Sequence, residues 1–162
     1  MERSEFRVEK GRTEATLVLA NGSTVRGIFF VSATSATRSG PERIKDVLNS
    51  EPGFFPFEIQ DALAIKTVLY HRDHVVMVTL SNNNEPSTDP GYEVATPRVV
   101  SMLLTNGQRL TGAVRVFRPV GRDRLSDYAR TNERFRYLEG PDATMIVNSS
   151  HVIELTEVSQ DA

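Results

Sequence analysis

The chain has 162 residues, which is enough for one ordinary domain or two small ones. Hydrophobic residues make up 39% and charged residues 25%, so the composition excludes disordered, collagen-like and membrane classes for the chain as a whole. A net charge of −2 argues against a dedicated nucleic-acid protein with a large basic surface, and the lack of cysteine excludes disulfides and thiolate zinc sites. With no long apolar run and a charged amino end, we expect a cytoplasmic protein that contacts no membrane.

A first unit is expected over residues 14–81. It opens with alternating apolar residues, the pattern of a strand with one buried face. Asn21-Gly22 follows, and both residue types tolerate the positive φ that a type I′ hairpin requires. In the second strand, residues 25–31, Gly27 falls in the inward-facing register, which favours a sharp bend.

A short helix is expected next. Pro41 stands at a plausible first helical position, and Ile44, Val47 and Leu48 share one helical face. Because the helix is short, it must be stabilised by packing on the sheet. Three further strands then complete the unit, and residues 70–73 lie near the tip of its last hairpin.

The same pattern recurs after a polar linker, residues 82–95, which contains two prolines. The match has an offset of 85 residues at the first hairpin, 81 at the helix and 77 at the end, where His74 matches His151. In this alignment Ile65 matches Ile146. An ordered series of matches indicates a duplicated unit, so a second copy is predicted over residues 96–158.

A strand, an Asn-Gly turn and a glycine-containing bent strand, as in residues 104–112, resemble the first motif of the Sm and Hfq family. Residues 145–153 resemble its second motif. The resemblance implies an all-β fold with short helical insertions, arranged as two tandem Sm-like (SH3-type) five-stranded barrels. It also implies assembly, with the two-barrel chain acting as a pseudo-dimer that builds a ring from fewer subunits. Residues 148–150 lack the basic pair of the family's RNA site, so that site is not carried over.

Arginine is concentrated in the second unit, because residues 109–136 contain eight arginines and three acids. Arginine with interleaved aromatic residues can bind single-stranded RNA through phosphate contacts and stacking, which makes RNA binding an alternative function. The same arginines could instead pair with nearby acids or cover a subunit interface. The candidate nucleic-acid or anion-binding residues are Arg118, Arg122, Arg124, Arg130 and Tyr128.

Three weaker motifs suggest other chemistry. The His-Arg-Asp-His segment at residues 71–74 has metal-ligand residue types, but a solvated turn explains it as well. Arg118 and Arg122 have the spacing of cyclic-dinucleotide-binding PilZ domains, although the partner motif is incomplete. Two Glu/Asp pairs, Glu58 with Asp61 and Glu139 with Asp142, suit acid–base work or ordinary turns.

None of these motifs amounts to a catalytic signature. We therefore expect no enzyme activity, no cofactor and no metal. The function predicted from the sequence is a non-catalytic binding or assembly module that forms a homo-oligomer or binds a protein partner.

Overall fold

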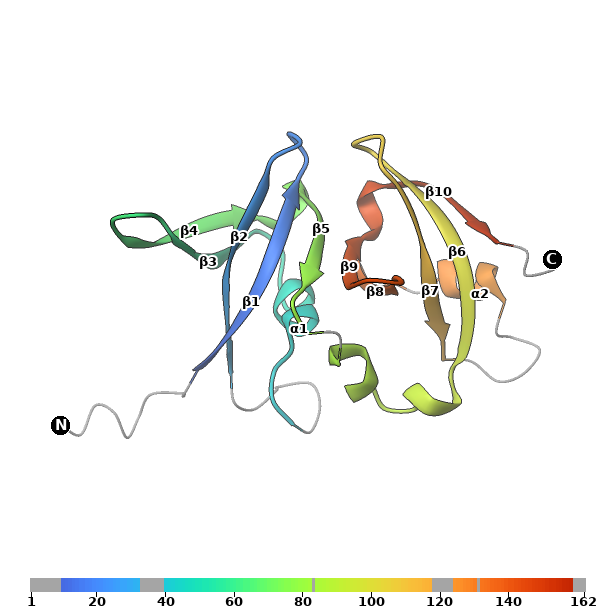
Figure 1. The fold of residues 1–162 in the computed structure, drawn as a ribbon. Coiled ribbons are helices and arrows are strands. Elements are labelled where there is room, and N and C mark those ends of the chain that lie inside the picture. Colours follow the sequence, from blue (N-terminus) through green and yellow to red (C-terminus); the bar gives the residue numbers. More distant parts are fainter. Residues whose placement is uncertain (1–9, 33–39, 83, 118–123, 131, 159–162) are drawn as a thin grey trace.

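The computed structural model describes residues 10–32, 40–82, 84–117, 124–130 and 132–158. The protein is all-β with short helices, and its ten strands form one antiparallel sheet in the order β10-β6-β7-β8-β9-β5-β1-β2-β3-β4 (Figure 1). In chain order the strands and α-helices are β1 (Lys10–Leu19), β2 (Thr24–Ser32), α1 (Ile44–Asn49), β3 (Phe54–Gln60), β4 (Ile65–His71), β5 (Val75–Leu80), β6 (Thr96–Leu104), β7 (Arg109–Val116), α2 (Leu125–Ala129), β8 (Phe135–Glu139), β9 (Thr144–Asn148) and β10 (Val152–Glu157).

Short 3₁₀ helices complete the fold. Two of them, η2 (Arg72–His74) and η5 (Ser149–His151), connect the last two strands of each half. Two more, η3 (Glu85–Thr88) and η4 (Tyr92–Val94), lie in the predicted linker.

The two halves repeat the same order of elements. The order β5-β1-β2-β3-β4 in the first half corresponds to β10-β6-β7-β8-β9 in the second. The prediction of closed barrels is wrong, because the sheet is not closed. The second side of β5 pairs with β9 of the other half, and no ladder among the described residues joins β4 to β5 or β9 to β10.

The hairpin turns differ in type from the prediction. Among the described residues positive φ is confined to glycines, so Asn21 does not adopt the left-handed conformation that a type I′ turn requires. Instead the Gly22 N–H donates to the Leu19 carbonyl (3.0 Å), and Gly22 itself has φ +90°. This is a type I turn followed by a left-handed glycine, the usual three-residue hairpin loop. Gly107 repeats it with φ +86°.

The predicted inward-facing register of Gly27 and Gly112 is confirmed, because both positions are buried. A Cβ built on Gly27 would lie 2.3 Å from the Glu58 carbonyl oxygen, and one on Gly112 would lie 2.8 Å from that of Glu139. Strand β2 therefore passes so close to β3 that only glycine fits at the crossing.

Helix α1 begins at Ile44, so Pro41 precedes the helix and is not its first residue as predicted. The Arg43 N–H donates to Asp46 Oδ2 (2.9 Å), which caps the amino end. The predicted face is correct, because Ile44 and Leu48 are fully buried and Val47 packs against the same core.

The sheet register corrects the alignment of the two copies. Leu69 lies opposite Pro56, and Ile146 lies opposite Tyr137, the residue 81 positions after Pro56. Ile146 is therefore the counterpart of Leu69, at an offset of 77 residues, and not of Ile65 as predicted. The β3–β4 hairpin is longer than β8–β9 by two residues in each arm, because the insertion is divided symmetrically about its turn.

Two hydrophobic cores fill the molecule, and both cross the midline. The first core combines residues of β1, β2, α1, β3 and β5 with Phe135, Tyr137 and Ile146 of the second half. The second core combines residues of β6, β7, β8 and β9 with Val76 and Met77 of the first half. Each half thus depends on the other for part of its buried apolar surface.

Candidate functional site

Within the described part of the chain, strands β4 and β10 each have one open edge, and they lie at opposite ends of the sheet (Figure 1). An open edge presents unpaired backbone N–H and C=O groups, to which another strand can add. The structure offers a direct comparison for such an addition, since β5 and β9 pair inside the chain.

At this internal junction, Met77 lies opposite Val147, Val78 opposite Ile146 and Thr79 opposite Met145. The apolar side chains are well covered: Ile146 and Val78 have no exposed surface. The apolar residues of this junction are therefore buried like those of a domain core.

The two open edges are the repeat counterparts of the two paired strands. At the offset of 77 residues, β4 corresponds to β9 and β10 to β5. The exposures differ sharply. Leu69 is 61% exposed where Ile146 is 0% exposed, and Ile153 is 64% exposed where Val76 is 0% exposed. Apolar residues that are buried at the junction are thus left uncovered at the edges.

A buried amide supplies the polar contacts of the junction. Asn148 Nδ2 donates to the carbonyl oxygens of Arg72 (3.2 Å) and Val75 (2.9 Å) in the other half, and Asn148 has no exposed surface. Its Oδ1 accepts from the Ser150 N–H (3.0 Å), which holds the amide in this orientation.

His71 is the counterpart of Asn148 on β4. Its Nδ1 accepts from the Asp73 N–H (3.1 Å), as Asn148 Oδ1 accepts from Ser150. His71 therefore repeats, at the open edge of β4, the contact by which Asn148 accepts from the backbone two residues further along the chain.

Further polar contacts connect the two halves close to the Asn148 side chain. Arg134 Nη2 binds Asp73 Oδ1 (2.6 Å), and this hydrogen bond holds the pKa of Asp73 below its usual value. His151 Nε2 lies 2.7 Å from the Asp73 carbonyl oxygen, and its Nδ1 lies 2.6 Å from Thr105 Oγ1.

The prediction of a solvated turn at residues 71–74 is wrong for Arg72, which is 2% exposed. Its guanidinium donates to the carbonyl oxygens of Leu48 (3.0 Å), Val47 (2.8 Å) and Phe54 (2.7 Å). Arg72 thereby binds two of the last carbonyl groups of α1, which have no i+4 N–H partner within the helix. Among the described residues no cluster of three or more His, Asp or Glu could hold a metal ion.

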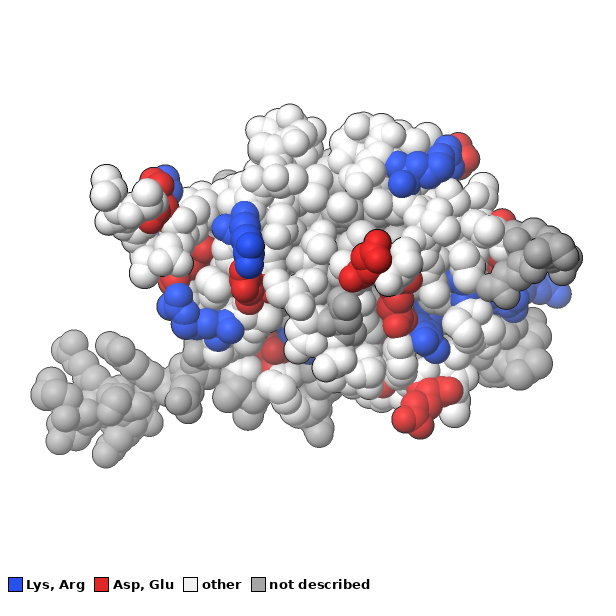
Figure 2. Space-filling view, in the orientation of Figure 1, with Lys and Arg blue, Asp and Glu red and all other residues white. Residues whose placement is uncertain are grey.

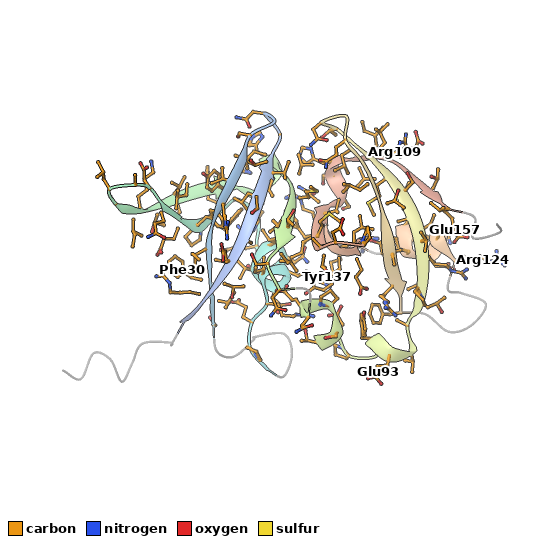
Figure 3. The ribbon with its side chains drawn as sticks, viewed as in Figure 1. Phe30, Glu93, Arg109, Arg124, Tyr137 and Glu157 are labelled. Atoms are coloured by element: carbon orange, nitrogen blue, oxygen red, sulfur yellow. The ribbon has the colours of Figure 1, made fainter. Side chains whose placement is uncertain are left out.

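The predicted nucleic-acid site is only partly within the described residues. Arg118 and Arg122 lie outside them. Arg124 and Arg130 are exposed next to the two ends of α2, and Figure 3 shows Arg124 at the outer end of the second half. Tyr128 is half-buried, with the Arg136 guanidinium 4.5 Å from its ring centre, and burial raises its pKa. Its ring is thus already stacked by an arginine of the same chain.

Other arginines of this stretch are engaged inside the molecule. Arg115 binds Glu139 (3.1 Å), and Arg136 Nη1 donates to the Tyr128 carbonyl oxygen (2.6 Å). On the face shown in Figure 2, the Lys and Arg of the described residues are interspersed with Asp and Glu and do not gather into one basic patch.

The two glutamates among the carboxylates considered for acid–base work have structural partners. Glu58 is buried and forms an ion pair with Arg12. Glu139 binds Arg115 and accepts from the Tyr92 hydroxyl (2.6 Å). The helices within the described residues are all too short and polar to cross a membrane.

A cavity of about 220 Å³ lies between the linker, β7, β8 and α2. Its charged lining is paired internally, for example Lys45 Nζ with Glu133 (2.9 Å) and Arg115 with Glu139. Tyr137 lies at its inner side, between the halves (Figure 3), and burial raises the pKa of its hydroxyl. We therefore assign this cavity no ligand.

The residues at the open edges were missed in the sequence. Leu69 and Ile153 stand in ordinary strand patterns. The alignment of the two copies paired Ile146 with Ile65 instead of Leu69, because it misplaced the insertion in the β3–β4 hairpin. No family model, curated protein or solved structure matches this chain.

Proposed function

We propose that this protein is a non-catalytic assembly module built from two Sm-like five-stranded halves. In the assembly, β4 of one copy pairs antiparallel with β10 of the next copy. The observation that carries the proposal is the β5–β9 junction, because it already joins the counterparts of these two edges inside one chain.

The junction also predicts the register of the intermolecular pairing. We replace each residue of the β5–β9 ladder by its repeat counterpart, 77 positions away in the other half. This places Glu154 opposite Tyr70, Leu155 opposite Leu69 and Thr156 opposite Val68. Leu155 and Leu69 would then meet as Val78 and Ile146 do in the buried junction.

Assembly through these edges is favourable for two physical reasons. It covers apolar side chains, of which Leu69 and Ile153 are more than half exposed, at about 25 cal/mol per Å² of buried area. It also pairs backbone groups at two open edges that would otherwise remain available to any strand.

The contact is heterologous, because two different edges of the chain meet. A heterologous contact closes into a ring or continues as a filament, depending on the rotation between copies. It cannot be satisfied within one chain, since β4 and β10 lie at opposite ends of the sheet (Figure 1).

A cross-linking experiment tests this pairing, and the absence of native cysteine makes it specific. The variants Val68→Cys and Thr156→Cys are purified separately, mixed and oxidised. We expect a disulfide-linked dimer in the mixture and none in either variant alone, because each cysteine then faces a native residue.

Mixing Val68→Cys with Ile153→Cys is the register control, since three residues of strand separate positions 153 and 156 by about 10 Å. Static light scattering of the unmodified protein accompanies the test. A strict monomer at micromolar concentration, or equal cross-linking in the register control, would contradict the proposal.

A charge substitution provides a second test. Leu69→Asp leaves the monomer intact, because residue 69 is 61% exposed, but it buries a carboxylate in the proposed interface. We expect the dissociation constant to rise about tenfold or more. Val94→Asp is the matched control, since Val94 is 87% exposed in the linker and belongs to neither edge.

A further inference from the structure

A cavity of about 160 Å³ lies in the second half between α2 and the open strand β10. Its lining is mainly apolar and consists of Met102, Tyr128, Ala129, Arg136, Val147, Ser149, Val152 and Leu155. Cavities of about 150 Å³ with apolar walls are large enough to hold a benzene ring.

The corresponding region of the first half is filled. The counterparts of the lining residues all belong to the first core or pack against it: Leu17, Val47, Leu48, Phe55, Tyr70, Arg72, Val75 and Val78. Three counterparts are much larger, since Arg72 stands in place of Ser149, Leu48 in place of Ala129 and Tyr70 in place of Val147. The main opposite change is Tyr128 in place of Val47, so on balance the second half fills less of the space beneath its helix with its own side chains.

The first core also receives side chains from the other half. Phe135 and Ile146 extend into it and have no exposed surface. Asn49, the last residue of α1, holds Phe135 in place, because its Nδ2 donates to the Phe135 carbonyl (2.9 Å) and its Oδ1 accepts from the Phe135 N–H (2.9 Å).

The counterparts of these two inserted residues are exposed. Phe54 corresponds to Phe135 and is 58% exposed, and Leu69 corresponds to Ile146 and is 61% exposed. The Phe54 ring packs edge-on against His71, with 4.8 Å between ring centres, so it is held near the open edge of β4.

We infer that Phe54 and Leu69 of one copy of this chain complete the core of the next copy by entering the cavity between α2 and β10. The inference rests on the proposed assembly and adds to it the side chains that determine its partner. The cavity accepts a phenylalanine and a leucine from the β3–β4 hairpin, as the first core accepts Phe135 and Ile146 from β8 and β9.

Fluorescence tests the location of Phe54, since the chain has no native tryptophan. In Phe54→Trp the emission should shift to the blue as the protein concentration rises and copies assemble. Leu63→Trp is the control, because Leu63 is 98% exposed at the tip of the same hairpin and lies outside the proposed contact. Its emission should remain that of an exposed indole at all concentrations.

A truncation tests the contribution of Phe54 to affinity. We expect Phe54→Ala to weaken assembly by about tenfold or more, as for a residue buried at the centre of an interface, with Leu63→Ala unchanged. The cross-link between Val68→Cys and Thr156→Cys is also measured in proteins that carry Phe54→Ala or Leu63→Ala, so that strand pairing is reported separately from affinity.

The outcomes separate the two proposals. If the cross-link forms while the indole emission of Phe54→Trp stays red and Phe54→Ala assembles like the parent, the strands pair but the cavity is not the site of Phe54, and this inference is overturned. If the Val68→Cys and Thr156→Cys variants do not cross-link and the parent protein does not assemble, the proposed function fails and this inference fails with it.

Discussion

Asn148 on β9 donates its amide N–H to the carbonyl oxygen of Val75 on β5 (2.9 Å), so one fully buried side chain connects the two halves of the molecule. The contact lies at the start of the strand pair that makes the sheet continuous. Because neither group can reach water, the junction depends on this amide being present and correctly oriented.

Replacing Asn148 with leucine is therefore expected to destabilise the protein. Two carbonyl oxygens, those of Arg72 and Val75, would lose their donor in a buried site, at a cost of about 2–3 kcal/mol. Chemical denaturation measures the change. Ser150→Ala is the control, since Ser150 is exposed and contributes only its backbone N–H, which the variant keeps; equal loss in both variants would contradict the explanation.

Arg72 should be among the most sensitive positions of the first half. Arg72→Met keeps much of the side-chain volume but removes three hydrogen bonds to carbonyl oxygens, so we expect a loss of about 2–4 kcal/mol in the free energy of unfolding. Arg26→Met, at an exposed arginine of β2, should change stability by less than about 0.5 kcal/mol. Similar effects at both positions would show that the buried contacts of Arg72 contribute little.

The crossing of β2 and β3 predicts a strong effect at Gly27. A methyl group there would meet the Glu58 carbonyl at 2.3 Å, so Gly27→Ala should destabilise the fold by about 1–3 kcal/mol or more. Gly11→Ala on neighbouring β1 is the control, because its Cβ would lie 3.4 Å from the nearest atom. Thermal unfolding compares the two, and an unchanged midpoint for Gly27→Ala would contradict the close approach.

The bridge between Asp73 and Arg134 predicts a pH effect with a defined sign. Hydrogen bonding to Arg134 lowers the pKa of Asp73 in the folded state. Its contribution to stability is therefore fully present above the ordinary aspartate pKa, about 3.9, and is lost as the pH falls through the lower folded value.

Comparison with Asp73→Asn isolates this contribution. The parent should be more stable than the variant at pH 7, and the difference should shrink below about pH 4, where a protonated Asp73 resembles asparagine. Unfolding free energies measured from pH 3 to pH 7 provide the test, and a difference independent of pH would rule out the bridge as its source.

Much of the local structure follows from sequence patterns. Alternating apolar residues located the strands, the spacing of Ile44 and Leu48 gave the correct helix face, and Gly27 and Gly112 marked inward-facing positions where the next strand passes close by. Each of these features depends on neighbouring residues, or on a clash that only glycine avoids.

Other features required the folded chain. The turns at Gly22 and Gly107 are not type I′, because asparagine permits positive φ without requiring it. The position of the hairpin insertion was misassigned, since a sequence alignment cannot divide an insertion between the two arms of a hairpin, whereas backbone pairing does.

The sequence by itself determined that the protein contains two copies of one all-β unit with a short helix, because apolar periodicity specifies which face of a strand is buried. The tertiary structure alone decided that β5 pairs with β9, and so left β4 and β10 open with Leu69 and Ile153 exposed. The physical reason is that any strand edge offers the same N–H and C=O groups. Periodicity therefore fixes the face of each strand, while its partner is chosen only when distant segments pack together.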